Sequence, residues 1–404
     1  MSQGPERQTI SSLAATNVSE SSHSLRAPLL IIFFLLLPMG CSRLSRKPSG
    51  QYVYVTAKQT YLRDRVAAVS NRTATVNNGE RLRVLEHGRR FLRVATDNTE
   101  TGWIDEKAVV TQAVFDDFNT LRRVHQKQAP VATATVRDEV NLHLTPGRDT
   151  QHFYRLAEGD KLQLLERAAL LKPGSQPHPA ANPSATPAQT IAAQVAAAKT
   201  AEEPPLMEDW WLVRDAKGNT GWLLSRMMDV DAPDALTRYS EGQRIVGAYV
   251  LTTVNDPDAP QDLKDIPIYV AVLNPFKAGL PYDFDQVRVF TWNRAKHRYE
   301  TAFREHNIEG YLPVQITQGR DPYGKSPTSE IDLPTFSYKV LAASAPEVTP
   351  DPVTGAIVPG ATITKTYRLE GNVVRRIFPP GQPPPAEAHP APPEKKVQPK
   401  KHKG

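Results

Sequence analysis

Side chains that could carry out catalysis or bind metals are few in this sequence. Cys41 is the single cysteine, and the ten histidines include no pair at metal-ligand spacing on a predicted helix. No serine lies in a nucleophile-elbow motif, and no glycine-rich phosphate loop occurs. Four aspartates between Asp256 and Asp265 lack the glycine-bearing, twelve-residue spacing of a calcium hand, so we interpret them as a solvated turn. We therefore expect no catalytic residue, no metal site and no cofactor.

The composition favours several folded modules joined and followed by linkers. The 404 residues are 40% hydrophobic and 23% charged, which is typical of a globular chain longer than one small domain. Its 36 prolines are roughly twice the average usage, so part of the length belongs to linkers or tails. The formal net charge of +6 is too small to indicate a nucleic-acid partner.

Cys41 stands at the end of a short apolar run. Residues Leu29–Leu37 follow Arg26, are far fewer than the roughly 20 that a membrane-spanning helix needs, and lead into Pro38-Met39-Gly40-Cys41. This segment resembles the lipobox of bacterial lipoproteins. The resemblance implies a signal peptide over residues 1–40, acylation of Cys41, a lipidated tether over 41–50, and export to the cell envelope. Ser42 in place of aspartate implies an outer-membrane lipoprotein facing the periplasm. The alternatives are an ordinary cleaved signal, or a buried apolar stretch with an incidental cysteine.

The chain contains an internal repeat. A shift of 80 residues places Gly79 on Gly159 and Glu86 on Glu166, and a shift of 119 then places Phe91 on Trp210 and Trp103 on Trp222. The difference is an alanine- and proline-rich insertion at about 167–209 of the second copy. Because the copies realign after it, the insertion is expected to leave one side of a hairpin and return to the other.

Each copy reads as short strands and turns that can bury a core by curling into a small barrel. Gly79-Glu80-Arg81-Leu82, Phe91-Leu92-Arg93-Val94 and Gly102-Trp103-Ile104, with their counterparts in the second copy, resemble the bacterial SH3 (SH3b) pattern. The resemblance implies two SH3-like domains, at 51–111 and 129–230. Between them, apolar residues at helical spacing predict a short helical connector over 112–128.

The rest of the chain is β-rich but does not repeat. Alternating and branched runs over 240–378 predict an antiparallel, sandwich-like β domain with no recognised family. Residues 379–404 hold nine prolines and five lysines, which predicts a disordered tail. The expected fold class is therefore mainly β, with two SH3-like barrels, a third β domain and disordered termini.

Several aromatic side chains are candidates for ligand binding. Trp103 and Trp222 are expected to fill the barrel cores. Since adjacent side chains on a strand face opposite ways, Trp210 is expected to point inward and Trp211 outward, where either the chain itself or a ligand would cover it. Three tyrosines of the first barrel, Tyr52, Tyr54 and Tyr61, are candidates to line a ligand groove.

These observations favour binding over catalysis. Cell-wall amidases with bacterial SH3 modules often use a cysteine nucleophile, but Cys41 belongs to the signal junction. The resemblance implies a non-catalytic lipoprotein, not an enzyme, that binds the stem peptides of peptidoglycan or an envelope protein and is held to the membrane by its lipid. The alternatives are a periplasmic protein–protein adaptor and a hydrolase with a site in 240–378. The sequence leaves the oligomeric state open.

Overall fold

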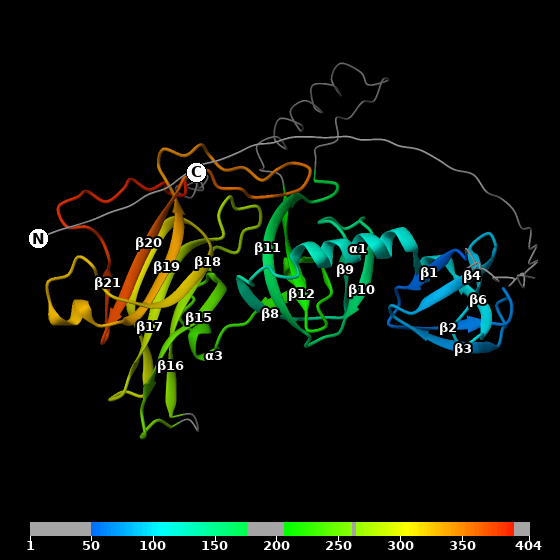
Figure 1. Cartoon of the computed structure of the whole chain (residues 1–404), viewed down its shortest axis with the longest axis horizontal. Helices are drawn as coiled ribbons and strands as arrows, with labels where there is room; N and C mark the ends of the chain where they lie inside the picture. Colours follow the sequence, from blue (N-terminus) through cyan, green and yellow to red (C-terminus); the bar gives the residue numbers. More distant parts are fainter. Residues whose placement is uncertain (1–49, 176–205, 261–263, 392–404) are drawn as a thin grey trace, which may run out of the picture. The chain divides into compact units, whose positions relative to one another are not determined.

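The computed structural model describes residues 50–175, 206–260 and 264–391 (Figure 1). The expected signal peptide, Cys41 and the tether lie outside these residues, as do most of the insertion and the last thirteen residues. The described residues belong to one compact unit. The described chain is mainly β, as predicted, and is built from three antiparallel sheets of seven strands each. Among the described helices, none is long and apolar enough to cross a bilayer.

The first sheet has the strand order β3-β2-β6-β5-β4-β1-β7. Its strands are β1 (Tyr52–Val55), β2 (Gln59–Arg63), β3 (Arg72–Asn77), β4 (Arg81–His87), β5 (Phe91–Ala95), β6 (Thr101–Asp105) and β7 (Val109–Thr111). A short 3-10 helix, η1 (Glu106–Ala108), precedes β7. The sheet curls around a core that includes Val55, Leu62, Leu82 and Val94.

The second sheet repeats this arrangement strand for strand, in the order β10-β9-β13-β12-β11-β8-β14. Its strands are β8 (Ala132–Val136), β9 (Val140–His143), β10 (His152–Leu156), β11 (Lys161–Leu171), β12 (Met207–Asp215), β13 (Thr220–Leu224) and β14 (Met228–Val230), with η2 (Ser225–Met227) before β14. The equivalent core contains Val136, Leu142, Leu162 and Val213. The two copies of the sequence repeat thus fold into two sheets of the same topology, and the mainly β fold is confirmed.

Equivalent glycines produce the same turn in both copies. Gly79 and Gly159 each have φ of +83°, a conformation that glycine adopts without the steric cost of a Cβ. Each donates its N–H over 2.9 Å to the first strand of its sheet, at the carbonyls of Val55 and Val136 respectively. The glycine that precedes each apolar run therefore fixes the start of β4 and of β11.

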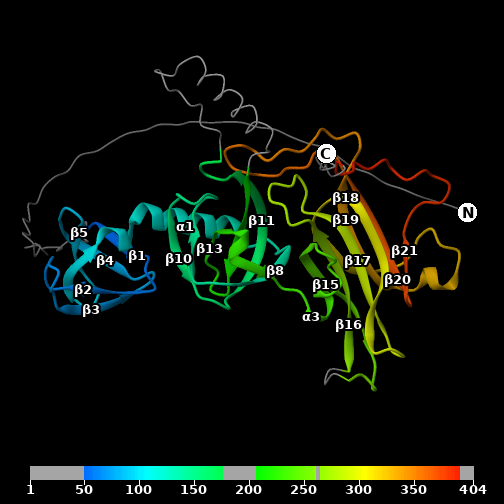
Figure 2. The same cartoon turned by 180° about the vertical axis from the view of Figure 1, so that it is seen from behind.

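Helix α1 (Gln112–His125) is the predicted connector and contacts both barrels, through β1 and β7 on one side and β13 on the other (Figure 2). Thr111 caps its first turn by accepting a hydrogen bond from the Val114 N–H. Phe118 is fully buried and joins a cluster with Tyr54 of the first barrel and Phe153 of the second.

The C-terminal sheet is a meander whose strand order follows the sequence. Its strands are β15 (Arg244–Asn255), β16 (Asp265–Asn274), β17 (Phe284–Asn293), β18 (Arg298–Gly319), β19 (Leu333–Leu341), β20 (Thr362–Glu370) and β21 (Val373–Arg376); α3 (Asp234–Thr237) precedes it and η3 (Pro327–Glu330) follows β18. Strand β15 contacts β18 and β19 without pairing to them, so the sheet curls over one face. One sheet therefore encloses a core as two facing sheets would. Val270 and Val272 line that core, while Ala271 and Leu273 face a smaller cluster on the other side.

The first part of the expected disordered tail is described, whereas residues 392–404 lie outside the described residues. Residues around Glu387 pair with the end of β19, through an isolated bridge from Ala342 to Glu387. The prediction that nothing folds after residue 378 is therefore wrong for this stretch. The prediction rested on the high proline content of this segment. Ala386 and Ala388, between the prolines, still have backbone groups that pair with the sheet.

Candidate binding site

The insertion in the second copy lengthens one hairpin of its barrel. Strands β11 and β12 stay paired from Leu162 and Asp215 out to Leu171 and Met207, so both ends of the insertion continue the two strands. This confirms that the insertion leaves one side of a hairpin and returns to the other. The extension carries polar side chains that the first barrel lacks, and Arg167 and Asp209 are the most buried of them.

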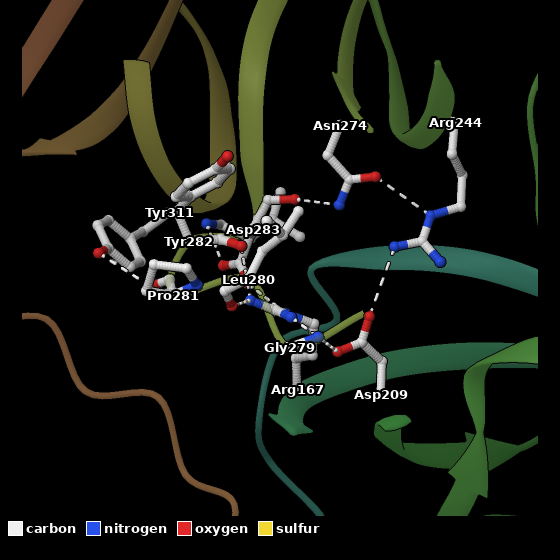
Figure 3. A network of polar contacts seen from close by, with 11 residues as sticks. Arg167, Asp209, Arg244, Asn274, Gly279, Leu280, Pro281, Tyr282, Asp283 and Tyr311 are labelled. Carbon is white, nitrogen blue, oxygen red and sulfur yellow. Dashed lines mark hydrogen bonds and ion pairs between the residues drawn. The ribbon is translucent and has the colours of Figure 1, made fainter. Parts of the chain in front are cut away.

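Arg167 fastens the extended hairpin to the C-terminal domain (Figure 3). Its Nε donates to Asp283 Oδ1 over 2.9 Å, and its Nη1 donates to Asp209 Oδ1 over 3.2 Å. Its Nη2 donates to two carbonyls, those of Leu280 at 2.8 Å and Tyr282 at 2.6 Å. Burial by itself would lower the pKa of this guanidinium, but the two carboxylates outweigh it and raise the pKa above its usual value. Arg167 is thus a fully paired structural cation.

Arg244, at the start of β15, is less completely paired. Its Nε donates to Asn274 Oδ1 over 3.2 Å, and its Nη2 lies 3.6 Å from Asp209 Oδ2 (Figure 3). Within the described residues, its two terminal nitrogens donate no hydrogen bond. Burial lowers the pKa of Arg244 and Arg167 lowers it further, against the opposing effect of Asp209. A half-buried guanidinium whose terminal N–H groups make no hydrogen bond is stabilised by an anionic group that reaches it.

Arg244 lines a cavity of about 420 Å³ between the second barrel and the C-terminal sheet. One part of the wall is apolar, with Trp211, Met228, Val230, Ile245, Val246 and Phe276. The remainder is polar and includes Arg137, Arg226, Asp229, Gln243 and Asn274. The volume is within the range of small-ligand pockets, and the mixture of apolar walls with a few polar groups is typical of them.

The charged groups of the wall differ in how far they are neutralised. Arg137 forms a two-pronged pair with Asp229, through Nε at 2.7 Å and through Nη2. Arg226 lines the cavity and forms no ion pair within the described chain. Phe276, which also lines the cavity, is 74% exposed, an unusual position for a large apolar side chain. The cavity can therefore hold a ligand with an anionic end and a small apolar body.

Trp211 lies at this cavity, but not in the orientation expected. It is only 5% exposed and belongs to the core of the second barrel, whereas Trp210 lies on the opposite face against Ala168 and Leu224. The predicted directions of the two tryptophans are therefore wrong. Leu92 occupies the equivalent core position in the first barrel, so Trp211 fills the core and borders the cavity at once.

The same error of one residue affects the glycine–tryptophan strands. Trp103 and Trp222 are half-buried and lie outside the barrel cores, which instead contain Ile104 and Leu223. Gly102 and Gly221 face inward because a Cβ there would come within 3 Å of Leu62 or Leu142. The tryptophans therefore face outward.

The three tyrosines of the first barrel do not line one groove. Tyr54 is buried beneath α1, where it stacks on Phe115 at 3.8 Å between ring centroids and donates to Gln112. Tyr52 packs at the edge of this cluster, with the Arg81 guanidinium 4.9 Å from its ring centroid. Tyr61 lies on β2 under the Arg72 guanidinium. Tyr54 thus has a packing role, and no described contact joins Tyr61 to the other two.

The described residues contain no cluster of three or more potential metal ligands. Asp256, from the acidic segment, accepts hydrogen bonds from the indole of Trp292 and contacts the ring of His297. Its carboxylate is therefore used within the fold, and Gln261–Leu263 of the same loop lie outside the description.

Sequence reasoning missed Arg226, Arg244 and Phe276 as cavity residues. They lie in two different modules, and no motif joins them in the chain. The one available signal was the position of the insertion, because its ends hold Arg167 and Asp209, which bring the two modules together.

No protein-family model matches this chain, and no curated protein matches its sequence. Among solved structures, NlpC2 from Trichomonas vaginalis is similar at 9% identity and a TM-score of 0.14, covering 48% of this chain and 54% of that one. An NlpC/P60 family protein from Bacillus cereus ATCC 10987 is similar at 9% identity and a TM-score of 0.20, covering 62% and 98%. The chain thus spans about half the length of the first. At these TM-scores the likeness defines neither a shared fold nor a shared activity.

Proposed function

We propose that this protein is a non-catalytic, lipid-anchored envelope protein whose cavity beside the second SH3-like barrel binds peptides of the cell wall. The lipid anchor is Cys41, and the barrels are of the bacterial SH3 kind. The ligand is a stem peptide of peptidoglycan, which combines small apolar side chains with free carboxylates. Both features match what the cavity offers.

Arg244 is the observation that carries this proposal. It is a cation in a cavity with an apolar wall, and its terminal N–H groups make no hydrogen bond within the described chain, where Nη2 only lies 3.6 Å from Asp209 Oδ2. A ligand carboxylate there would gain charge-assisted hydrogen bonds, worth about 1.5–3 kcal/mol. The apolar wall from Trp211 to Phe276 would accept the ligand's alkyl groups.

Sedimentation of the full chain with purified peptidoglycan tests the proposal. Arg244→Gln is expected to weaken binding about tenfold, which corresponds to about 1.4 kcal/mol. Arg294→Gln, in the exposed turn between β17 and β18, removes the same charge away from the cavity and is expected to change nothing. Equal binding by both variants, or no sedimentation of the wild type, would remove the wall peptide as ligand.

The two alternatives predict different results in the same assay. A protein–protein adaptor would not sediment with peptidoglycan but would keep an Arg244-dependent affinity for a carboxylate-bearing protein segment. A hydrolase with a site in 240–378 would release soluble fragments from the wall over time. Binding without release separates the proposed function from both.

A further inference from the structure

A short C-terminal segment, Ala386–His389, lies against the C-terminal sheet as an added strand. The Ala343 N–H donates to the Ala386 carbonyl, and the Ala388 N–H donates to the Leu341 carbonyl, both over 2.9 Å. These two bonds flank the antiparallel bridge between Ala342 and Glu387. We call Ala386–His389 the strap. Its backbone binds as an extended peptide binds an open sheet edge.

The edge is open there because the pairing between β18 and β19 ends before the end of β19. Their pairing reaches Val340 opposite Gly310. On the far side of Gly310, β18 contains an irregularity: its register against β17 shifts between Gly310 and His306, and Asn307 has φ of +62°. The end of β19 therefore offers backbone groups that β18 does not pair, and the strap takes them. The ring of His389 also contacts the Asn307 carbonyl at 2.7 Å.

The side chain of Glu387 enters a pocket of positive charge. Its Oε2 lies 2.8 Å from Lys365 Nζ, and its Oε1 lies 3.8 Å from Arg376 Nη2. Lys365 is only 2% exposed and also pairs with Glu305. Without the strap, two cations would face one carboxylate. With Glu387 in place the charges balance, so the pocket is complementary to a second carboxylate.

The remainder of the strap contributes little that is specific to it. Ala388 packs on an apolar cluster that includes Leu341, Tyr311 and Val348, while Ala386 and His389 are exposed. Prolines at 383–385 and 390 flank the strap and have no N–H to donate. Two backbone bonds, one carboxylate, one imidazole contact and one methyl group thus hold it, and each could be supplied by another chain.

We propose that the edge Leu341–Ala343 and the pocket of Lys365 and Arg376 form a receptor groove for an extended protein segment with a glutamate between small residues. The strap occupies this groove in the protein's own chain and competes with such a partner. This site lies on the C-terminal sheet, is lined by none of the residues of the cavity, and does not depend on the function proposed for the cavity.

Tethering explains why the resident strap excludes weak competitors. A segment tethered by a short linker that spans the distance to its site has an effective concentration in the millimolar range there. A free peptide of the same sequence has to match that concentration to displace it. Weakening the strap without changing the groove is therefore expected to reveal binding that the wild type hides.

The test uses a labelled peptide of residues 383–390 and fluorescence anisotropy with the full chain. Glu387→Lys repels the strap from Lys365 and Arg376, and Ala388→Pro removes the N–H that donates to Leu341. Both variants are expected to bind the peptide at least tenfold more tightly than the wild type does. Ala391→Pro, beyond the paired stretch, is the matched control and is expected to behave as wild type. A peptide with glutamine in place of the glutamate is expected not to bind.

Absence of binding by both strap variants, with circular dichroism unchanged, would overturn the proposal. If both variants lose their fold, hydrogen exchange of the wild type decides. Amides of Ala343 and Ala388 that exchange well before the sheet core would support a displaceable strap. Amides that exchange only on global unfolding would refute it. The peptidoglycan assay above is independent of either result, so each proposal can fail alone.

Discussion

The two barrels have the same strand order and equivalent cores, yet they differ at one hairpin. In the first barrel β4 and β5 are joined by a tight turn, where the Gly88 N–H donates to the Phe91 carbonyl over 2.9 Å. In the second, β11 and β12 run on past the barrel and carry Arg167 and Asp209. The position of His87 in the first copy corresponds to Arg167 in the second.

This difference shows how a repeated fold acquires a new contact without changing its core. The extended hairpin reaches the C-terminal domain through Asp283 and the carbonyls of Leu280 and Tyr282. A further bond joins the Ala169 N–H to the Gly355 carbonyl over 2.8 Å. The first barrel instead contacts its neighbour through Asn78, whose amide donates to the Phe153 carbonyl and accepts from the Arg155 N–H. The second barrel alone therefore borders the cavity.

The largest effect is expected from Arg167→Ala. The substitution leaves Asp209 and Asp283 without their buried cation, and breaking a buried pair in this way costs about 3–5 kcal/mol. His87→Ala, at the equivalent place in the first barrel, removes an exposed side chain and is expected to cost less than about 0.5 kcal/mol. Denaturant unfolding measures both. Equal losses of unfolding free energy would mean that the contacts of Arg167 stabilise the fold no more than an exposed histidine does.

A smaller loss is expected from Gly355→Ala, which alters the second contact of the hairpin. Gly355 has φ of +71°, and a Cβ there would lie 2.9 Å from the Ala169 carbonyl oxygen. We expect a loss of about 2–3 kcal/mol from conformational strain and the clash. Gly371→Ala, with φ of +62° and no atom within 4 Å of its Cβ, carries the conformational part alone, about 1 kcal/mol. If thermal melts show the same loss of stability for both variants, the close approach of Ala169 to Gly355 adds no steric cost.

The smallest effect concerns pH. Burial, and then His152, lower the pKa of His143 in the second barrel. The folded state thus favours the neutral ring, and stability should fall as the pH drops from about 7 through the unfolded value near 6.5. The first barrel has Arg63 at this place. His143→Gln should flatten the dependence of Tm on pH between 7.5 and 5.5 relative to the wild type. A slope equal to that of the wild type would contradict this.

The positions of the strands could be predicted from the sequence, but the face of the sheet toward which each side chain points could not. The alternating pattern located the strands of both barrels, yet Trp103, Trp211 and Trp222 were each assigned to the wrong face. A strand has a period of two, so an error of one residue reverses every side chain. The large size of the tryptophans favoured their placement in the core. The inward positions, however, belong to Gly102 and Gly221, where no Cβ fits.

The candidate site could be predicted only in part. The sequence predicts Trp211 as an exposed ligand-binding residue, and it borders the cavity although it is buried in the barrel core. Arg226 and Arg244 had no signal in the sequence, since surface arginines are common and these belong to different modules. The strap was missed because proline-rich composition indicates disorder without reporting which backbone groups remain free to pair.

The sequence by itself determined the repeat, the mainly β fold, the helical connector and the location of the insertion. These depend on local patterns of apolar spacing, glycine and proline, which act over a few residues. The tertiary structure alone decided that the insertion holds Arg167 against the C-terminal domain, that a cavity forms beside it, and that Glu387 meets Lys365. Those outcomes depend on which buried charges find partners across more than twenty residues of chain, and no local pattern contains that information.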